Sequence, residues 1–167
     1  MLHRLNHGLS IIGLTEIKIE IDSLYTLNTE IPGYKFISQP SLSNAGGVGL
    51  YINENLSFLL RSELSQSTSE YESNWIEVQS NLHENMLCGV VYRHPRGNAS
   101  RFLSYINDIL EVISNENKTC TLLGDFNLNL LNFEPHLDTH EFINILSSYF
   151  YSPHIIKPTR ITYHSAT

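Results

Sequence analysis

Short β-rich runs bounded by turn signals are the feature that most constrains how this chain can fold. The runs span residues 9–16, 34–37, 48–52, 75–79, 86–92 and 119–124. Apolar residues recur at helical spacing only later, from Phe102 to Ile113 and from Phe142 to Tyr149. Many strands followed by two late helices predict an α/β sandwich, in which helices cover sheets. Residues 1–167 are expected to form a single domain, because no linker, repeat or low-complexity tract interrupts them.

Local signals refine the expected elements. Asn98 and Asp138 each precede an apolar helical pattern, which predicts helix caps at these two residues. Residues 81–85 are expected to join the two runs on either side of them as a hairpin. Residues 61–73 are rich in Ser and Glu and are predicted to form an exposed loop. The tail from Pro153 to Thr167 is predicted to be extended.

Composition argues against several functional classes. A net charge of −7 speaks against a general nucleic-acid-coating protein, which is normally basic. No apolar run approaches the roughly 20 residues of a membrane span, and the N-terminus lacks the pattern of a secretory signal. The protein is therefore expected to be intracellular, nuclear or cytoplasmic, and not secreted. Cys88 and Cys120 both lie in apolar runs and are predicted to be buried free thiols.

The sharpest local motif is Gly124-Asp125-Phe126-Asn127, where an apolar run breaks into a loop. In extended backbone, Asp125 and Asn127 would project from the same face. A carboxylate and an amide at such a strand end can orient a water molecule and hold a phosphate oxygen. Gly124 would allow close approach of backbone or substrate. These residues also favour simple turns, so the motif alone leaves a turn and a phosphate site open.

Two further strand ends carry candidate ligands. Glu16 ends the first run, and a lone carboxylate suits Mg²⁺, which often takes only one or two from the protein. A solvated strand end is the alternative for Glu16. Tyr92 and Arg93 end another run, where a hydroxyl and a guanidinium can bind phosphate, although an aromatic residue there can also serve packing. Arg160, close to the C-terminus, is a second predicted substrate contact.

A rival metal site is suggested by His136 and His140, whose spacing of four would place two imidazoles on one helix face. The glutamate of a His-Glu-x-x-His motif is missing, no third ligand is evident, and a cap at Asp138 would leave His136 outside the helix. The other histidines, His94 among them, are expected at the surface or in loops. The segment 46–49 lacks the Lys-Ser/Thr of a phosphate-binding loop and predicts a turn.

Taken in order, five segments resemble the endonuclease domain of non-LTR (LINE-type) retrotransposons, in the endonuclease/exonuclease/phosphatase superfamily similar to DNase I. The segments are Ile11-Ile-Gly-Leu-Thr-Glu16-Ile-Lys18, Gly46-Gly-Val-Gly-Leu-Tyr51, Gly89-Val-Val-Tyr92-Arg-His-Pro95, Leu122-Leu-Gly-Asp125-Phe-Asn127 and Ile156-Lys-Pro-Thr-Arg-Ile-Thr162. Each is weak alone, but five in the family's order are specific. The resemblance implies a DNase I-like four-layer α/β/β/α sandwich, incomplete because the first strand and the C-terminal strands are missing.

The resemblance also implies a reaction. By position, Glu16 would bind Mg²⁺, with Mn²⁺ as a substitute, and Tyr92 would contact the scissile phosphate. Asp125 and Asn127 would position the phosphate and the nucleophilic water. The reaction would be hydrolysis of one strand of a DNA substrate, leaving a 3′-hydroxyl. A reverse transcriptase domain in the same full-length element would prime from that hydroxyl.

The chain departs from the family's pattern at both ends. In the family, a metal-site asparagine precedes the Leu-Thr-Glu segment, and an Asp-His pair that holds the general base follows the Pro-Thr-Arg-Ile-Thr segment. This chain contains neither. Because catalytic residues act as a unit, the chain is expected to be inactive by itself. The alternatives are a related phosphatase acting on small phosphoesters and a non-catalytic remnant that binds DNA or protein.

Overall fold

The computed structural model describes residues 8–18, 29–39, 41–42, 46–80, 83–131, 135–155, 157 and 159. Within these residues the chain forms, in order, β1 (Ile11–Thr15), β2 (Tyr34–Gln39), β3 (Val48–Asn53), β4 (Ser57–Leu60), β5 (Gln66–Ser67), β6 (Tyr71–Gln79), β7 (Met86–Arg93), α1 (Ala99–Asn115), β8 (Thr119–Asp125) and α2 (Leu137–Ser148). Every β-rich run of the sequence contains residues of a strand, although the first run, 9–16, extends beyond β1 at both ends, and the two helical patterns correspond to α1 and α2, with Tyr149 just after α2.

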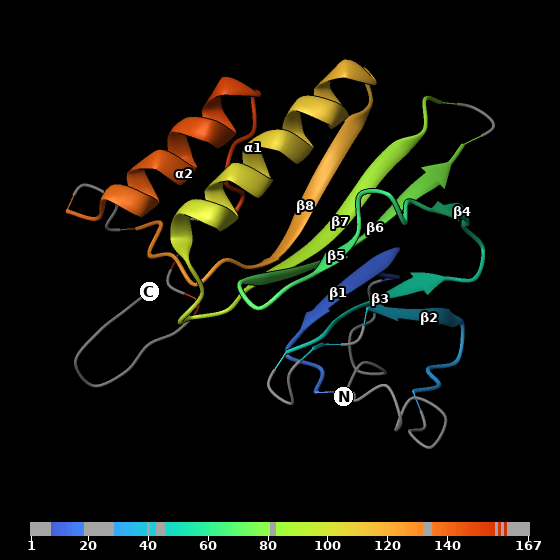
Figure 1. Cartoon of the computed structure of the whole chain (residues 1–167). Coiled ribbons are helices and arrows are strands. Elements are labelled where there is room, and N and C mark those ends of the chain that lie inside the picture. The colour runs from blue at the N-terminus through green and yellow to red at the C-terminus, as the bar shows by residue number, and fades with distance from the viewer. Residues whose placement is uncertain are drawn as a thin grey trace.

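The strands form two sheets that pack face to face (Figure 1). Sheet A has the order β1-β3-β2 and is antiparallel throughout. Sheet B has the order β4-β6-β7-β8, and the short β5 also pairs with β6. Strands β6 and β7 form the predicted antiparallel pair. Strand β8 runs parallel to β7, because α1 carries the chain back along the sheet between them.

Strands β6 and β7 are buried on both faces, which explains why β7 is almost continuously apolar. On one face of sheet B, Trp75, Leu87 and Val91 pack with Phe102 of α1 and Phe142 of α2. The residues packed between the two sheets are Val48, Leu50, Ile52, Ile76, Cys88, Val90 and Tyr92. The helices therefore cover one face of sheet B, and sheet A covers the other (Figure 1).

Three of the four predicted layers are formed by the described residues: a helical layer, sheet B and sheet A. A second helical layer, over the outer face of sheet A, is not found among them. Neither described helix is long and apolar enough to cross a membrane. Cys88 and Cys120 are free thiols, and they pack into the two different cores. Most of the tail predicted to be extended lies outside the described residues.

Both helices begin near the expected residues. Asn98 caps α1, and its side chain accepts a hydrogen bond from the N–H of Arg101, as predicted. The predicted cap at Asp138 is wrong, because α2 begins at Leu137, after His136, and Asp138 lies in the first turn. A carboxylate at this position still favours the helix, since the N-terminal end of the helix dipole is positive.

The prediction of an exposed loop over residues 61–73 is correct only in part: residues 61–65 and 68–70 lie outside strands, and Ser62, Glu63 and Ser69 are exposed. The segment contains β5 and the start of β6, and Leu64, Glu72 and Ser73 in it are buried. Polar residues can occupy the interior here because each has partners: the hydroxyl of Tyr105, for example, donates to Ser73 Oγ over 2.7 Å. The Ser- and Glu-rich composition therefore covers both exposed residues, such as Ser62, Glu63 and Ser69, and the buried, hydrogen-bonded Glu72 and Ser73.

A network of charged side chains ties one end of sheet B to α1. Arg61 donates to Glu77 over 2.9 Å and to Glu116 over 2.5 Å. Lys118 donates to the same two carboxylates, over 2.8 Å each. The hydrogen bond from Arg61, followed by that from Lys118, lowers the pKa of Glu116 to about 2. The ionised form of Glu116 therefore stabilises the fold.

Replacing Glu116 by glutamine should destabilise the protein at neutral pH by about 1 kcal/mol, a value kept small by solvent screening because 25% of the side chain is exposed. A carboxyl whose pKa is lowered in the folded state stabilises above its unfolded pKa, about 4.5, and this contribution is lost as the pH falls toward about 2. Urea unfolding of Glu116→Gln should therefore depend less on pH across that window than unfolding of the wild type. Glu111→Gln, an exposed position on α1, is the control.

Candidate active site

Glu16 and Tyr92 meet where the two sheets end. Glu16 directly follows β1 in sheet A, and Tyr92 lies near the end of β7 in sheet B. The hydroxyl of Tyr92 donates to Glu16 Oε1 over 2.8 Å, which joins residues 76 positions apart. Glu16 is exposed, whereas Tyr92 keeps only 2% of its surface accessible. Two of the predicted site residues are thus in direct contact.

The backbone around Glu16 is held in an uncommon conformation. Glu16 and Lys18 have φ angles of 53° and 52°, in the left-handed region that residues other than glycine seldom adopt. The N–H groups of Ile17 and Lys18 donate to the carbonyl oxygens of Gly47 and Gly46, over 3.2 and 2.8 Å. These two bonds continue the pairing of β1 with β3 beyond the strand end and stabilise the strained segment. Glu16 is therefore carried on a fixed backbone.

Tyr92 is held as a neutral hydrogen-bond donor. Burial, and then the hydrogen bond to Glu16, raise the pKa of Tyr92 well above its ordinary value. The negative charges of Glu16, Asp125 and Glu72 raise this pKa further. Three carboxylates thus surround one phenol, and its proton is directed at the carboxylate of Glu16.

Asp125 ends β8 directly beside Tyr92, its partner in the parallel register of β7 and β8. Its Oδ1 accepts the N–H of Asn127 over 2.9 Å, and Asn127 has a φ of 49°. The expectation that both side chains project from extended backbone is therefore wrong, because the segment is a turn. The turn nevertheless leaves Asp125 exposed at the same edge as Tyr92 and directs the Asn127 amide inward, where Nδ2 donates to the carbonyl of Arg93 over 2.7 Å.

Arg93 is directed into the protein. Only 7% of its surface is exposed. Its guanidinium donates to the carbonyl oxygens of Phe126, Asn127 and Gly97, over 2.7, 2.6 and 3.3 Å. It therefore holds the Asp125–Asn127 turn against β7, and a substrate contact by Arg93, which stays a prediction, would require some of these bonds to break. Arg160, the other predicted substrate contact, lies outside the described residues.

Arg93→Met should lower the free energy of unfolding by about 2–4 kcal/mol, because three backbone carbonyls lose a buried charged donor. Arg93→Lys should recover little of this loss, since an ammonium group cannot reproduce the fork of the guanidinium. Chemical denaturation measures both. Arg101→Met is the control: this arginine pairs with Glu70, its side chain is 71% exposed, and its loss should cost less than about 1 kcal/mol. Wild-type stability in Arg93→Met would contradict the structural role.

Two residues beside the site, Glu72 and His94, are missed by the sequence patterns. Glu72 is fully buried on β6, directly opposite Tyr92 on β7. His94 lies in the loop that follows β7, one of the two places expected for it, but its side chain is largely covered, and its Nε2 lies 3.4 Å from Glu72 Oε1. Its ring packs edge-on against the ring of Tyr92, with the centroids 4.9 Å apart. The back of the site therefore contains a carboxylate and an imidazole in addition to the predicted residues.

The exposed carboxylates suit a hard divalent cation. Glu16 and Asp125 each use one oxygen in a hydrogen bond with a described residue, which leaves the second oxygen of each for a ligand. Mg²⁺ commonly takes only one or two protein carboxylates and keeps several waters, so these residues fit it. Over the described ranges, no group of three or more His, Cys, Asp or Glu side chains could hold a metal. The histidine pair His136 and His140 thus gains no third ligand among them.

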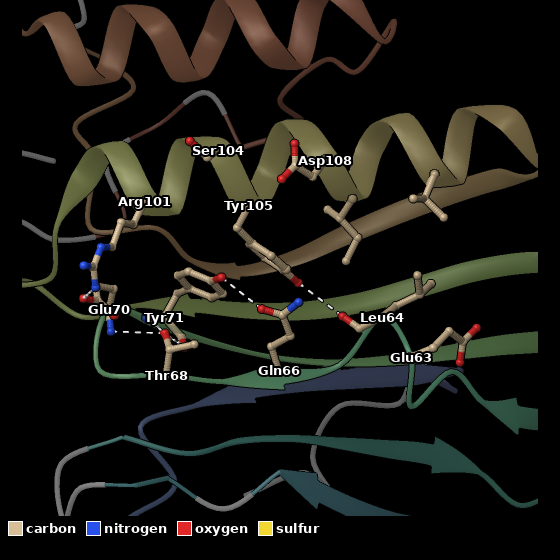
Figure 2. A pocket seen from close by; sticks show the side chains of 12 residues that line it. Glu63, Leu64, Gln66, Thr68, Glu70, Tyr71, Arg101, Ser104, Tyr105 and Asp108 are labelled. Carbon is tan, nitrogen blue, oxygen red and sulfur yellow. Dashed lines mark hydrogen bonds and ion pairs between the residues drawn. The ribbon is translucent and has the colours of Figure 1, made fainter.

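A hollow of about 480 Å³ lies away from these residues, between α1 and the β5–β6 segment (Figure 2). Tyr71 and Tyr105 stack there, with ring centroids 4.3 Å apart. Arg101 pairs with Glu70 over 2.8 Å, and the hydroxyl of Tyr71 donates to Gln66 over 2.9 Å. The lining side chains bond with one another, and the hollow shares no residue with the candidate site.

A scan of protein-family models finds no match to the sequence, and a search of curated proteins finds none either. Solved structures do match. The endonuclease domain of TRAS1, a telomere-specific non-LTR retrotransposon, gives a TM-score of 0.58 at 12% identity, over 77% of this chain and 59% of that one. The catalytic domain of Xenopus laevis APE2 gives 0.58 at 16% identity, over 83% and 59%. An endonuclease/exonuclease/phosphatase family protein from Bacteroides thetaiotaomicron gives 0.54 at 13%, over 83% and 55%.

The chain has the DNase I-like fold. The predicted resemblance to the endonuclease/exonuclease/phosphatase superfamily is thereby confirmed at the level of the fold. The chain spans between 55% and 59% of the length of these three structures. At such low sequence identity the likeness concerns the fold alone, and one fold can carry many activities. Function therefore has to be argued from the residues at the sheet edge.

Proposed function

We propose that this DNase I-like chain is a Mg²⁺-dependent phosphodiesterase domain that nicks DNA, of the kind found in non-LTR retrotransposons. The observation that carries the proposal is the contact between Tyr92 and Glu16 at the edge where Asp125 ends its strand. The TRAS1 domain, whose fold is similar, is an endonuclease. Charged and polar groups that converge at strand ends are the usual sites of chemistry in α/β folds.

Tyr92 and Asn127 would bind the phosphate, and Asp125 would bind the attacking water. Tyr92, kept neutral by its raised pKa, has one hydroxyl hydrogen, which it would turn from Glu16 to a phosphate oxygen when Glu16 binds the cation. Asp125 would accept a hydrogen bond from the attacking water and orient it toward phosphorus. Asn127 uses one amide N–H on the Arg93 carbonyl and would use the other on a phosphate oxygen.

Glu16 is the proposed ligand of Mg²⁺, with Mn²⁺ as a substitute. Its carboxylate is exposed, the backbone bonds of Ile17 and Lys18 hold its segment, and Tyr92 donates to it before substrate binds. When bound, the ion would neutralise charge on the phosphate and on the leaving oxygen. None of the four site residues has the role of general base in this scheme. Inactivity of the chain by itself stays a prediction.

The proposed partners follow from the same function. DNA is the proposed substrate, and a reverse transcriptase domain in the same element would use the product's 3′-hydroxyl. The proposed location is intracellular, nuclear or cytoplasmic. Two other functions are compatible with this fold: a phosphatase acting on small phosphoesters, and a remnant that binds DNA or protein without catalysis.

Incubating supercoiled plasmid with the protein and Mg²⁺, beside a sample containing a metal chelator, separates these functions. Conversion to open circles that requires Mg²⁺ supports the endonuclease. Release of inorganic phosphate from small phosphoesters, without nicking, would replace it with the phosphatase. Retention of DNA in a binding assay, without either reaction, would favour the non-catalytic remnant.

A further inference from the structure

The carboxylate of Glu72 lies behind the candidate site and is fully buried. Burying a charge is costly unless it is hydrogen-bonded, so such a group persists where its partners satisfy it. Glu72 has three partners from segments far apart in the sequence: the Ser41 hydroxyl donates to Oε1, the Gly47 N–H donates to Oε2, and His94 Nε2 lies 3.4 Å from Oε1. Glu72 of sheet B thus binds Ser41 and Gly47, which precede β3 in sheet A.

The contact between Glu72 and the Gly46–Gly47 turn is close. An added Cβ at Gly46 would lie 2.7 Å from both carboxylate oxygens of Glu72 and from Ser41 Oγ. Only a residue without a side chain fits there, so the carboxylate packs directly on the backbone of Gly46 and Gly47. The absence of a side chain at Gly46 therefore leaves room for the carboxylate of Glu72.

The same turn holds the segment that carries Glu16. The carbonyl oxygens of Gly46 and Gly47 accept the N–H groups of Lys18 and Ile17, the two residues that follow Glu16. Glu72 therefore binds the turn from one side, and the turn binds the Glu16 segment from the other. The chain of contacts closes at Tyr92, which donates to Glu16 and lies opposite Glu72 in the register of β6 and β7.

We propose that Glu72 is a positioning residue that holds Glu16 in place for its ligand. It acts through the Gly46–Gly47 turn and through His94, which packs on the ring of Tyr92. The ligand in question is the divalent cation, so this part rests on the proposed function. The expected effect of Glu72 on the backbone of Ile17 and Lys18 does not depend on the proposed function.

Glu72→Gln and Glu77→Gln form a matched pair for the test. Both glutamates lie on β6 and are buried, with 0% and 7% of their surface exposed, but Glu77 contacts Arg61 and Lys118 at the other end of the strand. Glutamine keeps the shape of the side chain and loses the charge that strengthens its hydrogen bonds. We expect Glu72→Gln to speed amide hydrogen exchange at Ile17 and Lys18 about tenfold relative to the rest of sheet A. Glu77→Gln should give no such local increase.

A second readout is the affinity of the folded protein for Mn²⁺, followed by the electron paramagnetic resonance of the free ion. Loss of a residue that orients a metal ligand typically weakens binding 10- to 100-fold, so Glu72→Gln should bind Mn²⁺ at least about tenfold more weakly and Glu77→Gln as the wild type does. If Glu72→Gln fails to fold, Ser41→Ala removes one of the three partners and should give a smaller increase at the same two amides.

Exchange at Ile17 and Lys18 that is the same in Glu72→Gln and Glu77→Gln would overturn the positioning role. A wild-type protein that binds no Mn²⁺ would instead count against the proposed metal site, and the exchange rates would still decide whether Glu72 holds the Glu16 segment. Selective exchange with unchanged Mn²⁺ affinity would limit Glu72 to a structural role and overturn its role toward the cation.

Discussion

Gly124→Ala should lower the free energy of unfolding by at least about 3 kcal/mol, a large part of the roughly 5–15 kcal/mol that stabilises a typical domain. Gly124 has a φ of 139°, which residues with a side chain rarely adopt, and an added Cβ would lie 1.8 Å from the carbonyl oxygen of Val91. Val91 lies on β7 and is the register partner of Gly124 on β8. The clash therefore cannot be relieved without separating the two strands. Urea or thermal unfolding measures the loss.

Gly8→Ala is the control for this experiment. Nothing lies within 4 Å of the Cβ that would be added at Gly8. The free energy of unfolding of Gly8→Ala should therefore differ from that of the wild type by less than about 0.5 kcal/mol. An unfolding midpoint of Gly124→Ala equal to that of the wild type would show that β8 does not pair with β7 in this register. The close approach predicted for Gly124 from the sequence is thus explained by the neighbouring strand.

Any Mg²⁺-dependent plasmid nicking by this chain, against the predicted inactivity, should fall by about 10²–10⁴-fold in Asp125→Ala, the range typical for groups that orient the water and stabilise the transition state. Asp125 is exposed, and its one described hydrogen bond to a backbone N–H is that to Asn127. Stability should therefore fall by only about 1 kcal/mol. The nicking rate is measured at a temperature where both proteins are folded.

Asp108→Ala is the matched control for Asp125→Ala. Asp108 is an exposed aspartate on α1 that lines the hollow in Figure 2, away from the sheet edge. Its loss changes the net charge by the same amount and should leave nicking at the wild-type rate. A measurable nicking rate that is equal in the two variants would remove Asp125 from the proposed site.

Much of the fold could be predicted because its signals are local. The apolar run in β7 and the helical spacing in α1 report burial directly, and the Asn98 cap is a contact over three residues. The start of β6 has no such signal. Glu72 and Ser73 are polar yet buried, and they have partners in distant segments (Ser41 and Gly47 for Glu72, Tyr105 for Ser73), so composition alone suggests a loop.

The candidate site was harder to predict for the same reason. The strand ends at Glu16 and Tyr92 could be predicted as edge positions, but their contact depends on how two sheets pack. Arg93 illustrates the limit most clearly. A guanidinium next to a strand end suggests a phosphate contact, and only the structure shows that the turn at Phe126 and Asn127 supplies its acceptors.

The proposed function requires a divalent cation to bind at the sheet edge formed by Glu16, Tyr92 and Asp125. Titration of ¹⁵N-labelled protein with Mn²⁺ tests it directly, because the paramagnetic ion broadens amide signals only in its neighbourhood. The amides of Glu16 and Asp125 should broaden first, at less than one equivalent of Mn²⁺, while that of Asp108 beside the hollow stays sharp. Broadening that centres on Asp108, or that spreads evenly over all exposed carboxylates, would show that the cation does not bind at this edge.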